Sequence, residues 1–348
     1  MTGIVYDDIF LEHGDPYHPE SAARLEAITA RLAEVGLRER MTELPTRAAQ
    51  VEEICWLHDH DYVADLRAIC DAGGGALDLD TIATEATYEA ALVAAGSCID
   101  AARAVVRGEV NNAFCLVRPP GHHSLPHRGM GFCFFNNIAL AAEALTRDGL
   151  SRLAIVDYDC HHGNGTQEMF YHRGEVLYIS LHQHPLYPGT GSLDEVGLDE
   201  GAGTNLNLPL LPQAQDAHYA RAFAEVVLPA LAQYQPGAIL VSAGYDGHFM
   251  DPLAQTSLTA AGFHAMTRSL VEAAQELCEG RVMAVLEGGY HLEFGLPESA
   301  EATARALLGD PAEAGWHEAD EPPHPLANES VKEALSHVIE VHRERLSL

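Results

Sequence analysis

The sequence is poor in positive charge, because it contains a single lysine among 348 residues and its formal net charge is −31. A field of this sign repels nucleic-acid phosphates, so we expect no binding to DNA or RNA. An acidic surface is typical of salt-adapted proteins, and it is also compatible with a cationic substrate. The charge does not separate these two explanations.

The sequence also lacks paired cysteine motifs and long apolar runs. Its seven cysteines are scattered singly, and the N-terminus has no basic start followed by an apolar stretch. This pattern favours reduced thiols over a secreted disulfide framework. No apolar run approaches the roughly 20 residues of a membrane-spanning helix. We therefore expect a cytoplasmic protein without a membrane partner, with enough hydrophobic residues (47%) for a large core.

Short apolar runs alternate with longer helix-like segments along the chain. The strand candidates are residues 3–6, 113–117, 153–157, 176–181, 238–242 and 282–286. Ala-rich amphipathic segments lie at 21–35, 86–107, 137–147, 216–233, 260–278 and 298–308. This alternation predicts an α/β fold with one open, mostly parallel β-sheet flanked by helices.

The domain organisation follows from the change in composition near residue 310. We expect residues 1–310 to form a single domain. Residues 311–327 are acidic and contain several prolines, which is typical of a connector. Residues 328–348 predict an amphipathic helix that docks on the core or on another subunit of a homo-oligomer, and the sequence does not decide which.

Polar clusters follow the carboxyl ends of five predicted strands, where open α/β sheets bind their ligands. Asp157, Asp159 and His161 alternate after the strand 153–157 and are expected to share one face. Carboxylate and imidazole ligands suit a divalent metal such as Zn²⁺. The alternative is a polar surface loop.

Three further clusters carry groups suited to catalysis. The sequence Pro-Pro-Gly holds His122 and His123 on a rigid loop, which is typical of an acid/base pair. Asp246 follows a buried strand and completes the metal site or caps a helix. Tyr290 follows two glycines and can donate to an oxyanion, although such a turn is weak evidence on its own.

Together these motifs resemble the zinc-dependent histone deacetylase family of the arginase–deacetylase superfamily, over about nine-tenths of the chain. They are RPPGHHS (118–124), GFCFFNNIALAA (131–142), VDYDCHHGNGTQ (156–167), ISLHQHPLYPGTG (179–191), SAGYDGHFMDPL (242–253) and VLEGGYHLE (285–293). The forms GHH, HHGNGTQ and LEGGYH are most similar to class II members and their bacterial amidohydrolase relatives. The resemblance implies the arginase/deacetylase fold, with residues 1–310 as the catalytic domain.

The resemblance also implies roles for the motif residues. Asp159, His161 and Asp246 would bind Zn²⁺, with Fe²⁺ as an alternative that the sequence does not exclude. Asp157 would hold His122, and Asn164 would hold His123, which accepts a proton from water and later protonates the leaving amine. Tyr290 would polarise the acyl oxygen.

Other carried-over roles concern a second ion and the acyl tunnel. The side chains of Asp157, Asp159, His161 and Ser180, with the backbone of Leu181, match a site for a monovalent cation, usually K⁺. Phe132 and Tyr187 match the tunnel walls, and Gly131 would offer its carbonyl to the substrate amide. For both aromatic residues, ordinary core packing is the alternative.

The implied reaction is hydrolysis of an acylated amine. Leu253 stands where polyamine-selective relatives carry Glu, so the resemblance favours acyl-lysine in proteins or peptides over small acetylpolyamines. Acetylpolyamine hydrolysis stays an alternative. A ureohydrolase with two Mn²⁺ ions would need more Asp ligands, and a non-catalytic acyl-lysine binder would lack Tyr290 or a metal ligand.

Overall fold

The computed structural model describes residues 1–317 and 325–346 and is built around an eight-stranded parallel sheet. The strand order is β2–β1–β5–β10–β9–β6–β7–β8. These strands are β1 (Thr2–Val5), β2 (Thr42–Glu43), β5 (Asn112–Cys115), β6 (Leu153–Asp157), β7 (Val176–Gln183), β8 (Asn205–Leu210), β9 (Ile239–Ala243) and β10 (Val282–Leu286). A small antiparallel pair, β3 (Gly74–Ala76) and β4 (Ile82–Thr84), lies apart from it. The predicted α/β fold with a parallel sheet is confirmed.

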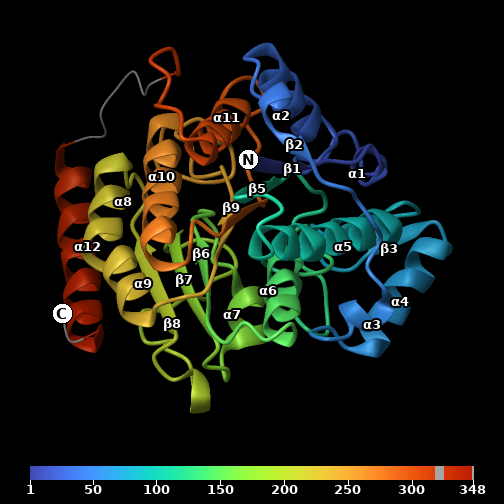
Figure 1. Cartoon of the computed structure of the whole chain (residues 1–348), viewed down its shortest axis with the longest axis horizontal. Coiled ribbons are helices and arrows are strands. Elements are labelled where there is room, and N and C mark those ends of the chain that lie inside the picture. Colours follow the sequence, from blue (N-terminus) through green and yellow to red (C-terminus); the bar gives the residue numbers. More distant parts are fainter. Residues whose placement is uncertain (318–324, 347–348) are drawn as a thin grey trace.

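Helices cover both faces of the large sheet (Figure 1). Helix α5 contacts β5 and β10 and packs beside α6, whereas α10 and α11 pack together and contact β10 and β5 from the other side. The α-helices are α1 (Ile9–Glu12), α2 (Ala23–Glu34), α3 (Val51–Ile54), α4 (His60–Asp71), α5 (Thr87–Val106), α6 (Asn137–Arg147), α7 (Asn164–Phe170), α8 (Asp216–Ala222), α9 (Leu228–Tyr234), α10 (Ala260–Leu277), α11 (Gly295–Leu308) and α12 (Pro325–Leu346).

The central strands are short apolar runs because both of their faces are covered. Every residue of β6, β9 and β10 is buried, as expected for strands of a parallel sheet between two helical layers. Two of the helices begin at a residue whose side chain satisfies a free N–H group of the first turn. The side chain of Asn136 accepts from the Ala139 N–H at the start of α6, and Thr259 accepts from the Gly262 N–H at the start of α10.

Several elements, among them the 12-residue helix α4, were not predicted, and two further differences have a physical reason. The edge strand β8 was not predicted, although its Asn-Leu-Asn-Leu-Pro-Leu pattern alternates with period two and an edge strand tolerates proline. The expected helix 216–233 is interrupted by a π-helical turn over Phe223–Val227 between α8 and α9. Pro229 in the first turn of α9 has no N–H to donate to the preceding turn, which favours a break at that place.

Helix α12 packs against β8 and α8 of its own chain. Its residues Val331, Leu335, Val338 and Ile339 are buried in the main core, and the Nε2 atom of His342 lies 2.8 Å from the carbonyl oxygen of Asn207 in β8. In the described part of the chain this helix therefore packs on the core of its own chain. Positions 318–324 of the expected connector and 347–348 of the expected final segment lie outside the described residues.

No helix among the described residues combines the length and the apolar character that crossing a membrane requires.

Candidate active site

Four loops that carry the predicted residues follow four adjacent strands of the sheet. The strands β5, β10, β9 and β6 are neighbours. The His122–His123 pair follows β5 and Tyr290 follows β10, while Asp246 follows β9 and Asp159 follows β6. Because the strands are parallel, all four loops meet at one edge. They surround a cavity of about 230 Å³. The ten predicted residues that line it are His122, His123, Gly131, Phe132, Asp159, His161, Tyr187, Asp246, Leu253 and Tyr290.

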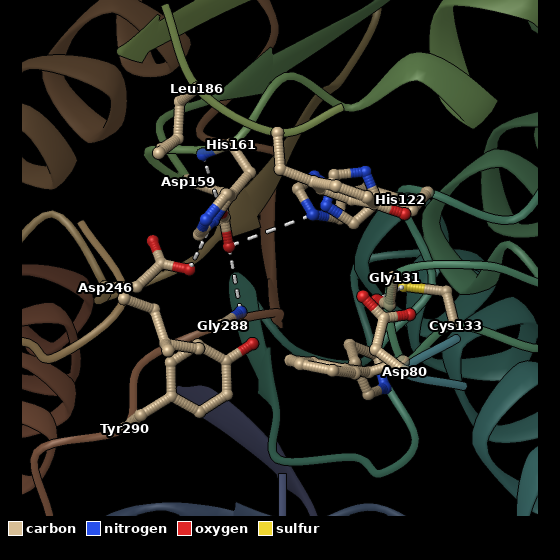
Figure 2. A pocket seen from close by; sticks show the side chains of 15 residues that line it. Asp80, His122, Gly131, Cys133, Asp159, His161, Leu186, Asp246, Gly288 and Tyr290 are labelled. Atoms are coloured by element: carbon tan, nitrogen blue, oxygen red, sulfur yellow. Dashed lines mark hydrogen bonds and ion pairs between the residues drawn. The ribbon is translucent and has the colours of Figure 1, made fainter. Parts of the chain in front are cut away.

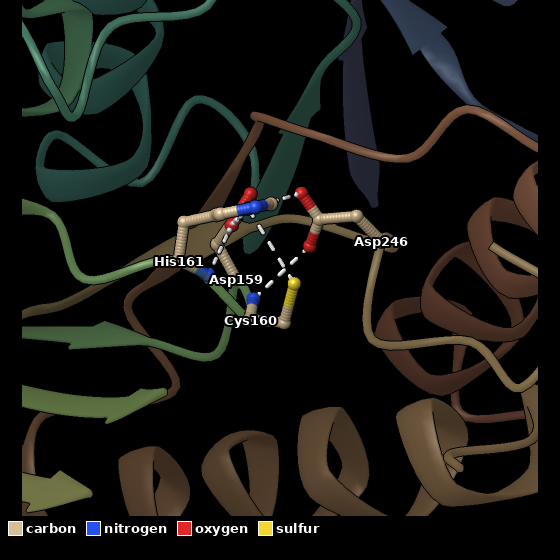
Figure 3. A group of neighbouring side chains, drawn as sticks. All are labelled: Asp159, Cys160, His161 and Asp246. Atoms are coloured by element: carbon tan, nitrogen blue, oxygen red, sulfur yellow. Dashed lines mark hydrogen bonds and ion pairs between the residues drawn. The ribbon is translucent and has the colours of Figure 1, made fainter. Parts of the chain in front are cut away.

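Asp159, His161 and Asp246 lie close together in this cavity and could hold a metal ion (Figure 3). The Nδ1 atom of His161 lies 3.2 Å from Oδ1 of Asp159 and 3.0 Å from Oδ2 of Asp246. Ligand atoms on a tetrahedral zinc ion with bonds near 2.0 Å lie about 3.3 Å apart. Two carboxylates and one imidazole at this spacing therefore fit a zinc ion and leave a position for water or substrate.

The charge of the cluster also suits a cation. Burial lowers the pKa of the His161 imidazole, but the carboxylates of Asp246 and Asp159 outweigh it and raise the pKa to about 10. The two carboxylates thus attract positive charge to the place where a metal would be bound. Backbone N–H groups fix their orientation, since Gly288 donates to Oδ2 of Asp159 and Cys160 donates to Oδ1 of Asp246.

Cys160 joins this cluster in the structure, although the sequence did not indicate it. Its Sγ atom lies 3.4 Å from Nδ1 of His161 (Figure 3). Burial, together with the nearby carboxylates of Asp246 and Asp159, raises the pKa of the Cys160 thiol well above its usual range. A metal prefers the thiolate, so the Asp and His side chains are the better ligands here.

Asp157 is the last residue of β6, and beyond it the strand alternation ends. The simple strand pattern predicted that Asp157 shares one face with Asp159 and His161. In the structure its side chain is not part of their cluster. Instead Oδ2 of Asp157 lies 3.0 Å from Nδ1 of His122, and the hydroxyl of Tyr178 donates to the same oxygen at 3.0 Å. Tyr178 was missed, because a tyrosine inside an apolar strand gives no signal of this contact.

The two histidines of the pair have different electrostatic surroundings. Burial lowers the pKa of His122, but the carboxylates of Asp157, Asp159 and Glu287 outweigh it and raise the pKa to about 10. His123 has its Nδ1 atom 2.8 Å from the neutral Oδ1 of Asn164, and its pKa is lowered well below the usual value by burial and by the neighbouring imidazoles. His122 is therefore suited to an electrostatic role as a charged imidazolium, and His123 is suited to accept a proton as a neutral imidazole.

Glu287 holds the loop of the His122–His123 pair in place, a contact that the residue pattern alone does not indicate. Its Oε2 atom accepts the N–H groups of Gly121 and His122 at 2.7 and 3.1 Å. Burial raises the pKa of the Glu287 carboxyl to about 7. The residue lies next to the Gly-Gly-Tyr turn, so it connects the His loop to the Tyr loop.

Tyr290 points its hydroxyl into the space between the metal cluster and the His pair (Figure 2). Burial raises the pKa of its phenol well above the usual value, and the carboxylates of Asp246 and Asp159 add to this effect. The phenol therefore keeps its proton and can donate a hydrogen bond. Phe132 packs edge-on against the Tyr290 ring, with centroids 5.8 Å apart.

The wall opposite Tyr290 depends on an unusual backbone conformation. Gly131 and Phe132 both have positive φ angles, +55° and +67°, and the Phe132 N–H donates to Oγ1 of Thr81. A Cβ atom on residue 131 would lie 2.5 Å from the His123 ring, so only glycine fits there. Strained residues of this kind persist where the surroundings hold them, often at functional sites. The carbonyl of Gly131 accepts from the Cys133 thiol at 3.3 Å.

The mouth of the cavity is lined by Tyr187, Leu253 and Asp80. Tyr187 packs edge-on against His123, with ring centroids 5.2 Å apart. The sequence suggested that the loop with Asp78, Asp80 and Glu85 could reach the mouth, with a solvated loop as the alternative, and of these three residues Asp80 lines the cavity. Asn164, Ser180 and Leu181 do not line the cavity. Ser180 lies beside Asp157 in the β6–β7 pairing, and its Oγ atom is 2.9 Å from Nδ1 of His182.

The match to a family model decides between the reaction classes that share this fold. Residues 18–307 match the model of the histone deacetylase domain. The chain belongs to the histone deacetylase family. Members of this family are zinc-dependent in general and hydrolyse amide bonds, so the chain is an amidohydrolase of the histone deacetylase type.

Individual relatives agree with this assignment to the histone deacetylase family. The chain is 42% identical to a probable deacetylase of Archaeoglobus fulgidus, over 89% of this chain and 87% of the relative. It is 43% identical to a histone deacetylase-like amidohydrolase of Pseudomonas aeruginosa, over 80% and 73% of the two chains. The crystal structure of the HDA15 HD domain superposes with a TM-score of 0.89 at 36% identity, covering 99% of this chain and 94% of the other.

Proposed function

We propose that this histone deacetylase-type amidohydrolase uses zinc to remove acetyl, or another short acyl group, from acylated lysine side chains in proteins or peptides. The observation that carries the proposal is the convergence of the Asp159–His161–Asp246 cluster, the His pair and the Tyr290 phenol on one cavity. Bound zinc, held by those three side chains, would supply a Lewis acid that polarises the acyl carbonyl and lowers the pKa of the attacking water. Fe²⁺ would suit the same ligands.

The protein groups move protons and stabilise charge. Nε2 of His123 accepts a proton from the attacking water and later donates it to the leaving amine, while Asn164 holds the opposite ring nitrogen. His122, paired with Asp157, places positive charge beside the reaction centre. The Tyr290 hydroxyl donates a hydrogen bond to the oxyanion as negative charge develops on the acyl oxygen.

The cavity walls suit an extended acylated side chain. Phe132 and Tyr187 would flank its methylene groups, and the Gly131 carbonyl would accept the N–H of the scissile amide. We further propose a structural K⁺ held by the side chains of Asp157, Asp159, His161 and Ser180 and by the backbone of Leu181. The opposition of Asp157 and Ser180 in neighbouring strands supports such a site.

Two features of the mouth support a polypeptide substrate. Leu253 places an aliphatic side chain at the mouth. A carboxylate at this position would instead attract the distal ammonium group of a polyamine. Leu79 is fully exposed beside Asp80, and Ile82 is half exposed in a smaller adjoining cavity that shares Asp80 and Phe132 with the site. Exposed apolar side chains around a polar cavity are typical of surfaces that bind polypeptide.

One observation favours the alternative substrate class, because the carboxylate of Asp80 lines the same mouth and would attract the second amine of an acetylpolyamine. Turnover of a fluorogenic acetyl-lysine peptide is therefore to be compared with turnover of acetylputrescine and acetylspermidine, each with and without a chelator. We expect peptide turnover to be faster and to be lost with chelator. Faster turnover of the polyamines would contradict the proposed substrate.

A further inference from the structure

The turn 287–290 that carries Tyr290 is held by side chains from three other segments. Arg24 of α2 donates to the carbonyl oxygens at positions 287 and 289, at 2.5 and 2.7 Å. Asp159 accepts the N–H at position 288, which Figure 2 shows as a dashed line. Asp251 accepts the N–H of Tyr290 itself at 2.6 Å. Four consecutive backbone positions of this turn thus have a partner from outside the turn.

Among these partners, Asp251 is the one that accepts the backbone N–H of Tyr290, whereas the Arg24 guanidinium lies over the Tyr290 ring, 5.0 Å from its centroid. It follows the metal-site residue Asp246 in the loop after β9, and its side chain is buried. Each carboxylate oxygen accepts one N–H group, Oδ1 from Leu253 at 3.0 Å and Oδ2 from Tyr290 at 2.6 Å. One carboxylate therefore joins the loop of the metal site, the mouth residue Leu253 and the loop of the phenol.

We infer that Asp251 is a positioning residue that sets the Tyr290 hydroxyl against the metal site, an inference that rests on the proposed function of that site. The hydroxyl lies at the far end of a rigid ring, so a small rotation of the turn moves it by a larger distance. A misplacement of about 1 Å at a reaction centre can reduce the rate by about a hundredfold. Asp251 touches no reacting atom, and it acts through the backbone of Tyr290.

Because both carboxylate oxygens of Asp251 accept an N–H group, the substitution Asp251→Asn tests this positioning role directly. Asparagine offers one oxygen and one NH₂ group, so neither flip of its amide can accept from both Leu253 and Tyr290. We expect kcat for an acetyl-lysine peptide to fall about tenfold to a hundredfold, with KM changed less than about threefold and zinc content unchanged. Asp251→Ala is the second variant, because it removes both acceptors without placing a donor against either N–H group.

A matched control is provided by Asp216, whose carboxylate accepts the N–H and hydroxyl of Thr259 away from the cavity. Asp216→Asn also removes one acceptor from a partly buried aspartate, and we expect its kcat to equal that of the wild type. Thermal unfolding of all variants shows whether any loss of rate follows from loss of folded protein. A kcat that falls equally in both Asn variants would overturn the inference.

The double variant separates positioning from general support of the fold. In a Tyr290→Phe background there is no hydroxyl to position, so Asp251→Asn should lower kcat less than about twofold. An equally large loss in both backgrounds, or a loss confined to KM or to zinc content, would overturn the inference. A crystal structure of Asp251→Asn adds a readout without turnover. A Tyr290 hydroxyl displaced by about 1 Å supports the inference, and an unmoved turn contradicts it, whichever substrate the enzyme proves to use.

Discussion

The floor and the mouth of the cavity are built in different ways. The floor, which we define as Asp159, His161, Asp246 and the His122–His123 pair, lies directly after central strands, and its polar groups have partners in the loops beside them. The mouth, defined as Asp80, Tyr187 and Leu253 with the exposed Leu79, lies on longer loops. Tyr187 is 37% exposed and Leu79 is fully exposed.

This contrast assigns the chemical step to the floor and the choice of substrate to the mouth. The floor contains groups whose charge and orientation are set by buried contacts, so a change there should abolish turnover with every substrate. The mouth contains groups in partial contact with solvent, so a change there should alter the ranking of substrates while the reaction continues. The experiments below test each half of that division.

The largest effect is expected from Asp246→Ala in the floor. The substitution removes one of the three proposed metal ligands and leaves the buried His161 imidazole with a single carboxylate neighbour. We expect deacetylation to fall by about a thousandfold or more, since metal catalysis supplies several kcal/mol. Zinc content measured by elemental analysis should fall in parallel. Full activity with bound zinc would show that another ligand set is used.

Tyr290→Phe should have the next largest effect. It removes one donor to the oxyanion and keeps the ring that packs against Phe132, so kcat should fall on the order of a hundredfold while zinc stays bound. Steady-state kinetics with peptide and polyamine substrates measures this loss. A donor to the acyl oxygen should affect both substrate classes alike, and near-wild-type kcat with either would contradict the assigned role.

A stability effect is expected at His58, which contacts both ends of the segment 125–136 that carries Gly131 and Phe132. Its Nε2 atom accepts the N–H of Asn136, and its Nδ1 atom faces the carbonyl of Leu125. Burial lowers the pKa of His58 from 6.5 to about 4, so the folded state favours the neutral ring. Stability from this residue is present above pH 6.5 and is lost as the pH falls towards 4, by about 3 kcal/mol.

Urea unfolding of the wild type and of His58→Gln between pH 7 and 4 measures this contribution. The glutamine does not titrate, so the stability difference between the two proteins should shrink as the pH falls. A constant difference would show that His58 keeps the same proton affinity after unfolding. Deacetylase activity at pH 7 serves as the control for an intact site.

The smallest effect is expected from Leu253→Glu in the mouth. A carboxylate there would attract the distal ammonium of an acetylpolyamine, so the ratio of acetylspermidine to acetyl-lysine peptide turnover should rise about tenfold. Leu253→Gln is the neutral control of similar size. An unchanged ratio in both variants would show that the side chain at 253 does not select the substrate.

The sequence was sufficient for the central strands of the sheet and for the candidate residues of the floor, because both depend on local patterns. Buried β-branched runs predict the strands, and polar residues directly after parallel strands must meet at one edge. The metal-site residues and the His pair were therefore recognisable as candidates. Contacts across loops were not, because Asp251, Glu287 and Tyr178 act on backbone or side-chain groups that are distant in sequence. Likewise, nothing in the order of residues indicates that Phe132 adopts a positive φ.

The position of helix α12 affects how a truncated form of this chain would behave. The strand β8 lies at one end of the sheet order. Within residues 1–317 and 325–346 its outer backbone groups have no neighbouring strand, and His342 of α12 reaches one of its carbonyls. Uncovered strand edges recruit other chains. The family match ends at residue 307, before this helix begins. A fragment that stops at the family boundary would keep the whole catalytic cavity and still be prone to aggregate through its bare edge.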